Sequence, residues 1–297
     1  MTRDRQTPRT RTALPTFGLA IAGLALSVSL VGAALAQDDG GWTDQRREWN
    51  QPQEPFHIAG NVHYVGTAGL SAFLITDPKG HVLIDGGLPE SAPLILANIR
   101  KLGFDPKDVR ILLINHAHFD HSGGLAELKR ATGAKLLASA GDRADLESGH
   151  TAGRDDLLDF PKVAVDRVIA DGAHIRLGKI DLVTRVTPGH TPGCTSWTTT
   201  ISEGGRSLNM IFACSISVAG RELTPEAQKQ FASTFATLRG LRADIFVNFH
   251  PDAFDLAGKR KRQQAGDALA FVDPAELGRQ VDAAERTLRG ELAKRPN

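Results

Sequence analysis

The chain has 297 residues, of which 41% are hydrophobic and 23% are charged. A chain of this length and composition can bury a large hydrophobic core in one or two domains. Its formal net charge of +1 gives no basic excess to recruit nucleic acid, and the sequence has neither a solenoid-like repeat nor a low-complexity segment.

The first 36 residues have the pattern of an export signal. Four arginines form a basic head, an apolar stretch runs from about Leu14 to Leu35, and residues 34–36 form a small-x-small cleavage site. Cleavage would remove four Arg and one Asp, so the formal charge would fall from +1 to −2 in a mature periplasmic chain of residues 37–297. The apolar stretch is also long enough for an uncleaved membrane anchor, which is the alternative.

The first half of the mature chain is expected to contain strands followed by helices. Apolar runs predict strands at residues 61–66, 72–76, 81–84 and 109–115. The apolar spacing from Ala92 to Ile99 predicts a helix that ends near Gly103, and a second helical pattern opens at residues 122–124.

The second half is expected to contain more strands and two further helices. Apolar runs predict strands at residues 167–169, 174–177, 180–186, 195–201, 208–215 and 243–249. Thr224 and Pro225 are typical of the start of a helix, and the last helix should end near Lys294. The basic run at residues 259–262 is short and follows a helix-compatible segment, so it is interpreted as a solvated helix face.

Residues 116–121 place three imidazoles and a carboxylate on one short segment between a predicted strand and a predicted helix. In an extended chain, His116 and His118 point the same way and can chelate one ion, while Asp120 and His121 can turn towards a second. Imidazole nitrogen and carboxylate oxygen are ligands that suit zinc. The segment therefore predicts a metal site on a strand-to-helix loop.

Two later histidines also follow predicted strands. His190 lies between two Pro-Gly dipeptides, which make a rigid turn that presents one side chain. His250 ends an apolar run, so it too should lie at the end of a strand.

The pattern His116-x-His118-x-Asp120-His121 resembles the signature of the metallo-β-lactamase superfamily, whose remaining ligands lie on two later loops. Residues 66–93 and 187–197 are most similar to the third subclass of the zinc-dependent β-lactamases, and the resemblance runs from about Pro55 to Leu256. It implies an α/β fold, the αβ/βα sandwich of two mixed sheets with helices on the outer faces, in a single catalytic domain over residues 37–297. Composition and pattern alone establish only a mixture of α and β.

The resemblance also implies the roles of individual residues. Two zinc ions would be bound, one by His116, His118 and His190, the other by Asp120, His121 and His250. Asp120 would in addition orient a metal-held hydroxide that attacks the amide carbonyl, without a serine acyl-enzyme. Ser215 and Ser217 would bind the substrate carboxylate, although both are equally compatible with ordinary strand-edge hydroxyls. Asp85 would support the metal loops.

The function implied is hydrolysis of the β-lactam amide of penicillins, cephalosporins and carbapenems, giving antibiotic resistance, by a monomer with no nucleic-acid partner and no stable membrane partner. The alternatives are a lactone or thioester hydrolase with the same binuclear zinc centre, and a catalytically silent zinc-binding periplasmic protein. The sequence departs from the subclass where Cys214 replaces an aspartate and where the loop after Gly220 is short.

The two cysteines, Cys194 and Cys214, belong to the predicted hairpin, and a turn centred on Gly204 would set them directly opposite one another. Export to an oxidising compartment favours a disulfide wherever the geometry permits. Two alternatives stay open, namely two free buried thiols and a Cys214 thiolate that binds the second zinc.

Overall fold

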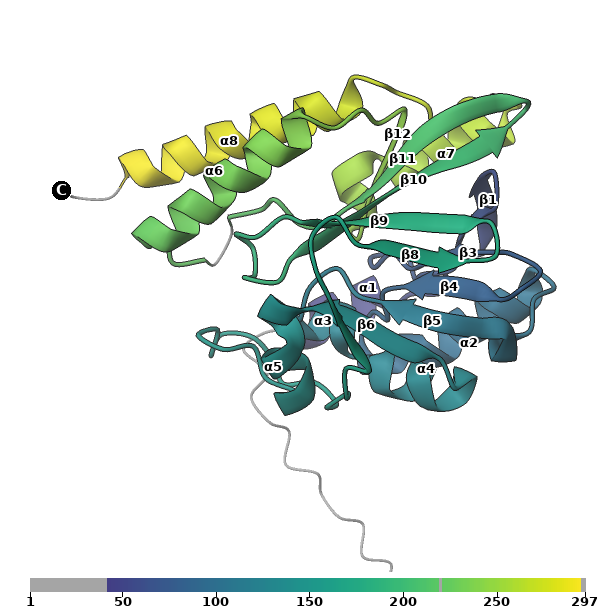
Figure 1. The fold of residues 1–297 in the computed structure, drawn as a ribbon, viewed down its shortest axis with the longest axis horizontal. Helices are drawn as coiled ribbons and strands as arrows, with labels where there is room; N and C mark the ends of the chain where they lie inside the picture. The colour runs from purple at the N-terminus through teal and green to yellow at the C-terminus, as the bar shows by residue number, and fades with distance from the viewer. Residues whose placement is uncertain (1–41, 219–220, 295–297) are drawn as a thin grey trace, which may run out of the picture. The chain divides into compact units, whose positions relative to one another are not determined.

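The computed structural model describes residues 42–218 and 221–294, which belong to one compact unit, residues 38–297. The predicted export signal lies outside the described residues. The unit contains a seven-stranded and a five-stranded β-sheet, with helices on the outer faces of both (Figure 1). This architecture confirms the predicted sandwich of two mixed sheets.

The first sheet follows the order of the chain. Its strands are β1 (Phe56–Ala59), β2 (Val62–Tyr64), β3 (Phe73–Ile75), β4 (His81–Ile84), β5 (Val109–Leu113), β6 (Lys135–Ser139) and β7 (Arg167–Ile169). Strands β1 to β4 pair antiparallel, and β4 to β7 pair parallel. Every residue of β3 and β4 is buried, as expected for strands covered on both faces.

The second sheet has the order β12-β11-β10-β9-β8. Its strands are β8 (His174–Leu177), β9 (Ile180–Val186), β10 (Thr195–Glu203), β11 (Arg206–Ala213) and β12 (Ile245–Asn248). All neighbours are antiparallel except β11 and β12, which are parallel and therefore need a crossover connection. A long helix provides that crossover.

The helices form the two outer layers. They are α1 (Trp42–Trp49), α2 (Ala92–Lys101), α3 (Phe119–Ser122), α4 (Leu125–Thr132), α5 (Ala140–Ser148), α6 (Pro225–Arg239), α7 (Leu256–Gln264) and α8 (Glu276–Ala293). Figure 1 shows α2 and α4 against the first sheet, and α6 and α8 side by side on the far face of the second. As predicted, the side chain of Thr224 caps α6 by accepting a hydrogen bond from the Ala227 amide.

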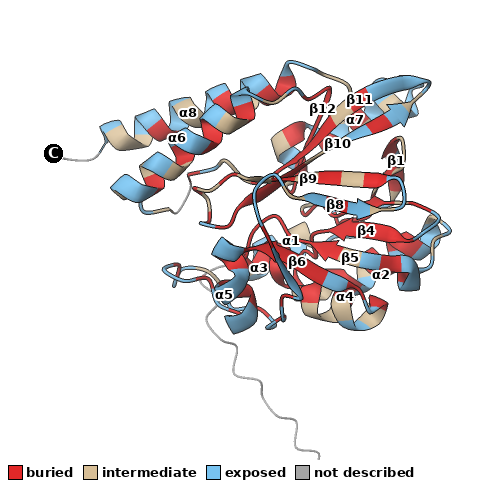
Figure 2. Ribbon diagram, viewed as in Figure 1, coloured by how far each residue is buried: buried red, intermediate tan, exposed pale blue. Residues whose placement is uncertain are grey.

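The core lies between the two sheets and beneath each helical layer. Phe73 of β3 and Phe212 of β11 meet across the sheets with ring centroids 5.2 Å apart. Figure 2 shows buried residues along most strands, and exposed residues on β8, at the tip of the β10–β11 hairpin and along the outer sides of the helices. A continuous apolar layer thus joins the two sheets, and the polar loops lie at the ends of its strands.

The sequence assigned one strand to the wrong half and left five of the helices and strands unpredicted. β7 was expected to open the second half, but it pairs in parallel with β6 and forms the edge of the first sheet. The unpredicted elements are α1, β1, α3, β6 and α5. Strand β6 is only five residues long, which is too short for periodicity to separate a strand from a buried helix.

The β10–β11 hairpin differs from its predicted register by one residue. Gly204 and Gly205 both have positive φ, 55° and 76°, as a two-residue type I′ turn requires. Glu203 therefore pairs with Arg206, so that the turn centre falls between the two glycines instead of on Gly204.

In the basic run at residues 259–262, Lys259 differs from the predicted solvated helix face. Its side chain is only 3% exposed, and its ammonium group donates to Glu276 Oε2 at 2.5 Å and to the Phe246 carbonyl at 3.3 Å. The prediction of a solvated helix face is therefore wrong for Lys259, whereas Lys261 and Arg262 are exposed as predicted. A buried charge needs a paired partner, which α8 supplies.

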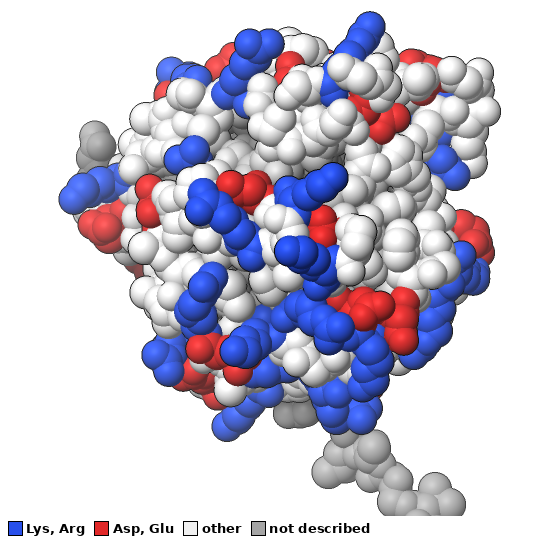
Figure 3. All heavy atoms as spheres, turned by 45° about the vertical axis from the view of Figure 1, so that its right-hand side comes forward, with Lys and Arg blue, Asp and Glu red and all other residues white. Residues whose placement is uncertain are grey.

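The surface carries both signs of charge. On the face in Figure 3, acidic side chains lie among the lysines and arginines. Exposed pairs such as Lys294 and Glu291, 2.7 Å apart, contribute little because water screens them. In residues 42–218 and 221–294, none of the helices combines the length and apolarity needed to cross a membrane.

Replacing Glu276 with Ala should lower the free energy of unfolding by about 3 kcal/mol, because it leaves a buried ammonium without its carboxylate. Urea denaturation of the mature protein measures the change. Glu291→Ala is the matched control at an exposed pair and should change the free energy by less than about 0.5 kcal/mol. Equal effects of the two substitutions would contradict a stabilising buried pair.

Candidate metal centre

The candidate ligands follow three strands from both sheets. His116 and His118 follow β5, His190 follows β9, and His250 follows β12. Asp120 lies in α3, which begins directly after His118 and includes His121, and the Ser122 amide donates to the His118 carbonyl at 2.8 Å. The predicted strand-to-helix loop is therefore limited to residues 114–118, and the rest of the cluster is helical.

The first group contains His116, His118 and His190, whose ligand atoms all lie within 4.8 Å of one another. The Nε2 atoms of His116 and His118 are buried, and among the described residues they have no hydrogen-bond partner. Nδ1 of His190 donates to the Ser217 carbonyl at 2.9 Å, which leaves its Nε2 as a free lone pair. Buried nitrogens without partners, all facing one another, fit a metal ion.

The second group contains Asp120, His121 and His250. Nε2 of His121 lies 3.2 Å from Nε2 of His250, and each of these nitrogens lies 3.4 Å from Asp120 Oδ2. Ligands bound to tetrahedral zinc at 2.0–2.1 Å are about 3.3 Å apart. The three side chains thus already have the spacing that a zinc ion needs.

Burial keeps the first group in the form that binds metal. It lowers the pKa of His116 and of His118 well below the ordinary value, and the neighbouring imidazoles lower both further. Burial also lowers the pKa of His190 to about 4. All three rings are therefore neutral at pH 7 and offer a lone pair without first releasing a proton.

The second group carries the negative charge of the site. Burial alone would raise the pKa of Asp120, but the adjacent His121 and His250 outweigh it and hold this pKa well below its usual range. Asp120 and Asp85 in turn raise the pKa of His121 against the effect of burial. Asp120 is thus an ionised carboxylate, as a metal ligand must be.

Asp85 holds His121 of the second group in position. Its Oδ1 accepts from the Asn115 amide at 2.9 Å, and its Oδ2 lies 2.9 Å from His121 Nδ1. The residue has φ 69°, an uncommon backbone conformation for an aspartate, and its own amide donates to the Leu113 carbonyl. The carboxylate fixes the ring of His121 with Nε2 towards the other ligands, the supporting role implied by the sequence.

Asp142, at the start of α5, was not identified from the sequence. Its Oδ2 accepts from the Ala117 amide at 3.0 Å and from the Thr191 hydroxyl at 3.1 Å, and its Oδ1 accepts from the Gly193 amide at 2.9 Å. One carboxylate therefore ties the loop after β5 to the loop after β9. Burial raises its pKa to about 7, although the three donors oppose the rise. The signal for Asp142 in the sequence was a carboxylate that follows the short apolar stretch of β6.

An aromatic group from α1 also lies beside the ligands. The ring of Trp49 is 5.4 Å from that of His250, and the ring of Trp42 is 5.0 Å from that of Phe119. Trp42 Nε1 donates to the Asp156 carbonyl at 3.1 Å. The sequence showed only a polar segment with two tryptophans, because the partners of these rings lie far along the chain.

Ser215 and Ser217, the predicted carboxylate-binding residues, follow β11 close to the first group. Ser215 is partly exposed, Ser217 is exposed, and the Ser217 carbonyl accepts from His190. Ser215 Oγ accepts from the Ser217 amide at 3.3 Å. The structure thus places the two serines beside the first ligand group, and their role towards a substrate stays a prediction.

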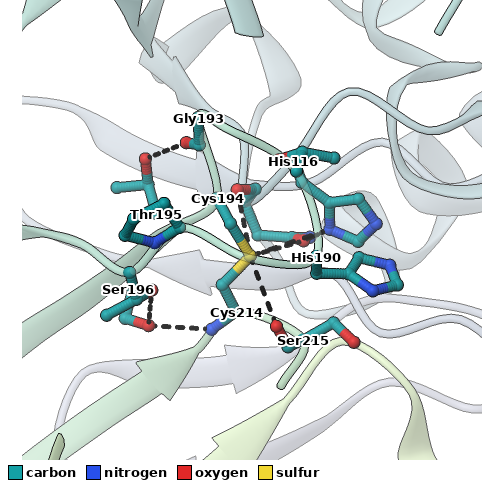
Figure 4. Close-up of a disulfide and its surroundings, with 12 residues drawn as sticks. His116, His190, Gly193, Cys194, Thr195, Ser196, Cys214 and Ser215 are labelled. Atoms are coloured by element: carbon teal, nitrogen blue, oxygen red, sulfur yellow. Dashed lines mark hydrogen bonds between the residues drawn. A yellow bond between two sulfur atoms is a disulfide. The ribbon is translucent and has the colours of Figure 1, made fainter. Parts of the chain in front are cut away.

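Cys194 and Cys214 form a disulfide, with Cα atoms 5.9 Å apart (Figure 4). Cys194 lies just before β10 and Cys214 just after β11. The strand register places them one residue away from direct opposition, so the predicted directly opposed pair is wrong, although the disulfide itself forms. The bond links the His190 loop to the Ser215 segment, and Cys214 Sγ lies 3.7 Å from His116 Nδ1. Free thiols and a zinc-bound thiolate are both excluded for this disulfide-bonded state.

Comparison with known proteins yields a family match and similar structures. Residues 66–202 match the model of the metallo-beta-lactamase superfamily. A solved subclass B3 metallo-beta-lactamase of Bradyrhizobium japonicum is 36% identical, with a TM-score of 0.80 over 84% of this chain and 97% of that one.

Two curated relatives share a shorter segment. A hydroxyacylglutathione hydrolase of Rhodospirillum rubrum is 30% identical over 35% of this chain and 34% of its own length. An N-acyl homoserine lactonase of Agrobacterium fabrum is 30% identical over 41% of this chain and 56% of its own length. The chain thus spans less than two thirds of either relative.

Asp142→Ala should weaken zinc binding by about 10- to 100-fold, because the two ligand loops lose the carboxylate that joins them. Competition with a chromogenic chelator measures the affinity. Asp155→Ala, which removes a carboxylate from a 97% exposed side chain, is the control and should bind zinc as the parent does. Parental affinity in Asp142→Ala would show that the loops hold their positions without this group.

The disulfide predicts that the mature protein, unfolded without reductant, will have no reactive thiol. After reduction the same sample should titrate two thiols, because the sequence contains two cysteines. A thiol-reactive chromophore provides the measurement. Two thiols before reduction would contradict the bond between Cys194 and Cys214.

Proposed function

Because the chain belongs to the metallo-β-lactamase superfamily, we propose that it is a zinc-dependent hydrolase of β-lactams, acting on the amide of penicillins, cephalosporins and carbapenems. The observation that carries the proposal is the pair of three-residue groups, whose ligand atoms lie close together; two residues of each group are buried, and the third, His190 or His250, is partly exposed. Similarity along nearly the whole length of a subclass B3 enzyme favours the β-lactam amide as the substrate.

The proposal assigns one zinc ion to each group. Imidazole nitrogens and a carboxylate form a donor set that suits zinc, and softer sulfur donors are unavailable because both cysteines are in the disulfide. Bound zinc supplies an activated water at neutral pH and polarises the amide carbonyl. The chain's own residues then determine how water and substrate are oriented.

Asp120 is proposed as the residue that orients the attacking water. Its carboxylate lies within 3.4 Å of both His121 Nε2 and His250 Nε2, and its low pKa keeps it ionised as a hydrogen-bond acceptor. An acceptor fixed in this way holds the water O–H in one direction and so aims a lone pair at the carbonyl carbon. Ser215 and Ser217 are proposed to donate hydrogen bonds to the carboxylate of the substrate.

A lactone or thioester hydrolase is the second candidate, favoured by the similarity to two curated relatives with those activities in their names. Such enzymes usually have an aspartate after the strand that here ends before Cys214 and Ser215, and neither residue is a carboxylate. The β-lactam proposal takes precedence because the chain covers 97% of the subclass B3 enzyme but only 34% and 56% of these two relatives. The same proposal includes a periplasmic location, a monomeric state and resistance to antibiotics in the cell.

Zinc-loaded mature protein should open the ring of a chromogenic cephalosporin and of a carbapenem, and a chelator should remove this activity until zinc is restored. Inhibitors that trap an active-site serine should have no effect, because the nucleophile is a water. Absorbance of the opened ring measures the rate. Turnover of an acyl homoserine lactone or of a glutathione thioester, with none of any β-lactam, would decide for the second candidate.

His118→Ala should reduce turnover by about a hundredfold or more, since removing a direct ligand should cost at least as much as removing an outer partner. The fold should persist, because His118 lies on a loop above the packed core. Circular dichroism and zinc content accompany the rate measurement. His174→Ala, at an exposed histidine far from both groups in the sequence, is the control and should retain parental activity. Parental turnover by His118→Ala would refute the ligand assignment.

A further inference from the structure

The two cysteines and His116 form a third group of candidate metal ligands. Their ligand atoms all lie within 4.8 Å of one another, and all three residues are buried. Figure 4 shows His116 beside the disulfide. In the oxidised protein the sulfurs of Cys194 and Cys214 are bonded to each other, so this group can hold a metal ion only after reduction.

The distances around Cys214 fit the coordination of one metal ion. Its Sγ lies 3.7 Å from His116 Nδ1 and 3.2 Å from the Asn115 carbonyl oxygen. A sulfur and a nitrogen bound to one tetrahedral zinc are about 3.6 Å apart, and two sulfurs are about 3.8 Å apart. Reduction lets the two sulfurs separate to that distance by rotation of the cysteine side chains, while the nitrogen is already in place.

Hydrogen bonds hold the three segments together without the S–S bond. The Cys214 amide donates to Ser196 Oγ at 3.0 Å. The Thr195 amide donates at 2.8 Å to the Asn115 carbonyl, which ties β10 of the second sheet to the loop after β5. Reduction of the disulfide removes neither hydrogen bond, so the three ligands should stay within reach of one metal ion.

His116 can serve only one metal site at a time. A neutral imidazole has a single lone pair, on either Nδ1 or Nε2. In the oxidised protein Nδ1 donates to the side-chain oxygen of Asn115, so the lone pair is on the buried Nε2, which belongs to the first ligand group. A metal ion bound to Nδ1 would shift the ring proton to Nε2 and so remove His116 from the first group.

We propose that Cys194, Cys214 and Nδ1 of His116 form a third metal site, for a thiophilic cation, which the disulfide keeps closed. Thiolates bind such cations more tightly than the imidazoles of the first group do. The disulfide therefore keeps His116 available to the first group. This inference goes beyond the proposed function, because it concerns which metal ions the protein binds and not which substrate it hydrolyses.

Opening the site is a two-electron reduction by a dithiol. The donor closes its own disulfide, its two electrons break the S–S bond, and its two protons move to the sulfurs of Cys194 and Cys214. A divalent cation then displaces both protons as it binds the two thiolates.

Cadmium gives a direct test, because its bonds to thiolates absorb in the ultraviolet and its bonds to imidazole and carboxylate do not. The mature protein is unfolded and refolded with a phosphine, which supplies the two electrons and becomes an oxide with oxygen from water. After removal of metal and phosphine without air, cadmium should produce the thiolate band within about the first equivalent, and binding should end at about two ions per chain. The oxidised protein should also bind about two ions, but without the band.

Two variants identify the ligands. The double variant Cys194→Ser/Cys214→Ser, treated in the same way, lacks both the bond and the sulfurs and should show no band. His116→Ala in the reduced state should bind the first cadmium ion about tenfold or more weakly, because a direct ligand is lost. His57→Ala, at an exposed histidine, is the matched control and should keep the parental affinity. Competition with a chromogenic chelator measures both affinities.

Three results would overturn the proposal. The first is a reduced protein with parental circular dichroism, two titratable thiols and no thiolate band, and the second is equal cadmium affinity in His116→Ala and His57→Ala. The third is a further cadmium ion bound by the reduced protein beyond the number that the oxidised protein binds.

Should the reduced chain fail to refold, the folded protein is reduced by the phosphine without denaturant until both thiols titrate, and the same three criteria apply. None of these measurements uses a β-lactam. Failure of this proposal can therefore be told apart from failure of the proposed function.

Discussion

Much of the site depends on two buried carboxylates, Asp142 and Asp85, which hold the loops after β5 and β9 at one edge of the sheets. Each loop alone has no fixed distance to the others, because β5, β9 and β12 belong to two different sheets. Asp142 joins the loops after β5 and β9, and Asp85 orients His121 beneath them. A carboxylate that accepts several fixed donors makes separate segments move as one. The ligands are thereby positioned before any metal arrives.

The parts of the site that the sequence revealed are those whose chemistry is concentrated in short segments. Three imidazoles and a carboxylate within residues 116–121, and a histidine between two Pro-Gly turns, need no distant partner to be recognised. Asp142 has only a weaker signal, its place after the short apolar stretch of β6. It acts through contacts with residues 25 or more positions away, which a single sequence does not record.

The errors in the predicted fold have a similar origin. Lys259 was interpreted from its basic neighbours, but its burial is decided by Glu276, which a later helix brings to it. The hairpin register depends on whether one or both glycines of the turn adopt positive φ, and the structure uses both. Strand β7 was assigned by its position in the chain, whereas its partner β6 was too short to be predicted. Strand positions in the second half were otherwise close to the observed bounds.

The disulfide also bears on the order in which the molecule is assembled. Its cysteines are separated by 20 positions in the chain and flank a single hairpin, whereas His121 and His250, which must meet in the second ligand group, are separated by 129. Local contacts close early in folding, and distant ones late. We therefore expect oxidation to join the His190 loop to the serine segment while β12 is still undocked. The thiol chemistry of the compartment would then influence the yield of folded chains, and zinc would stabilise a site completed only at the end.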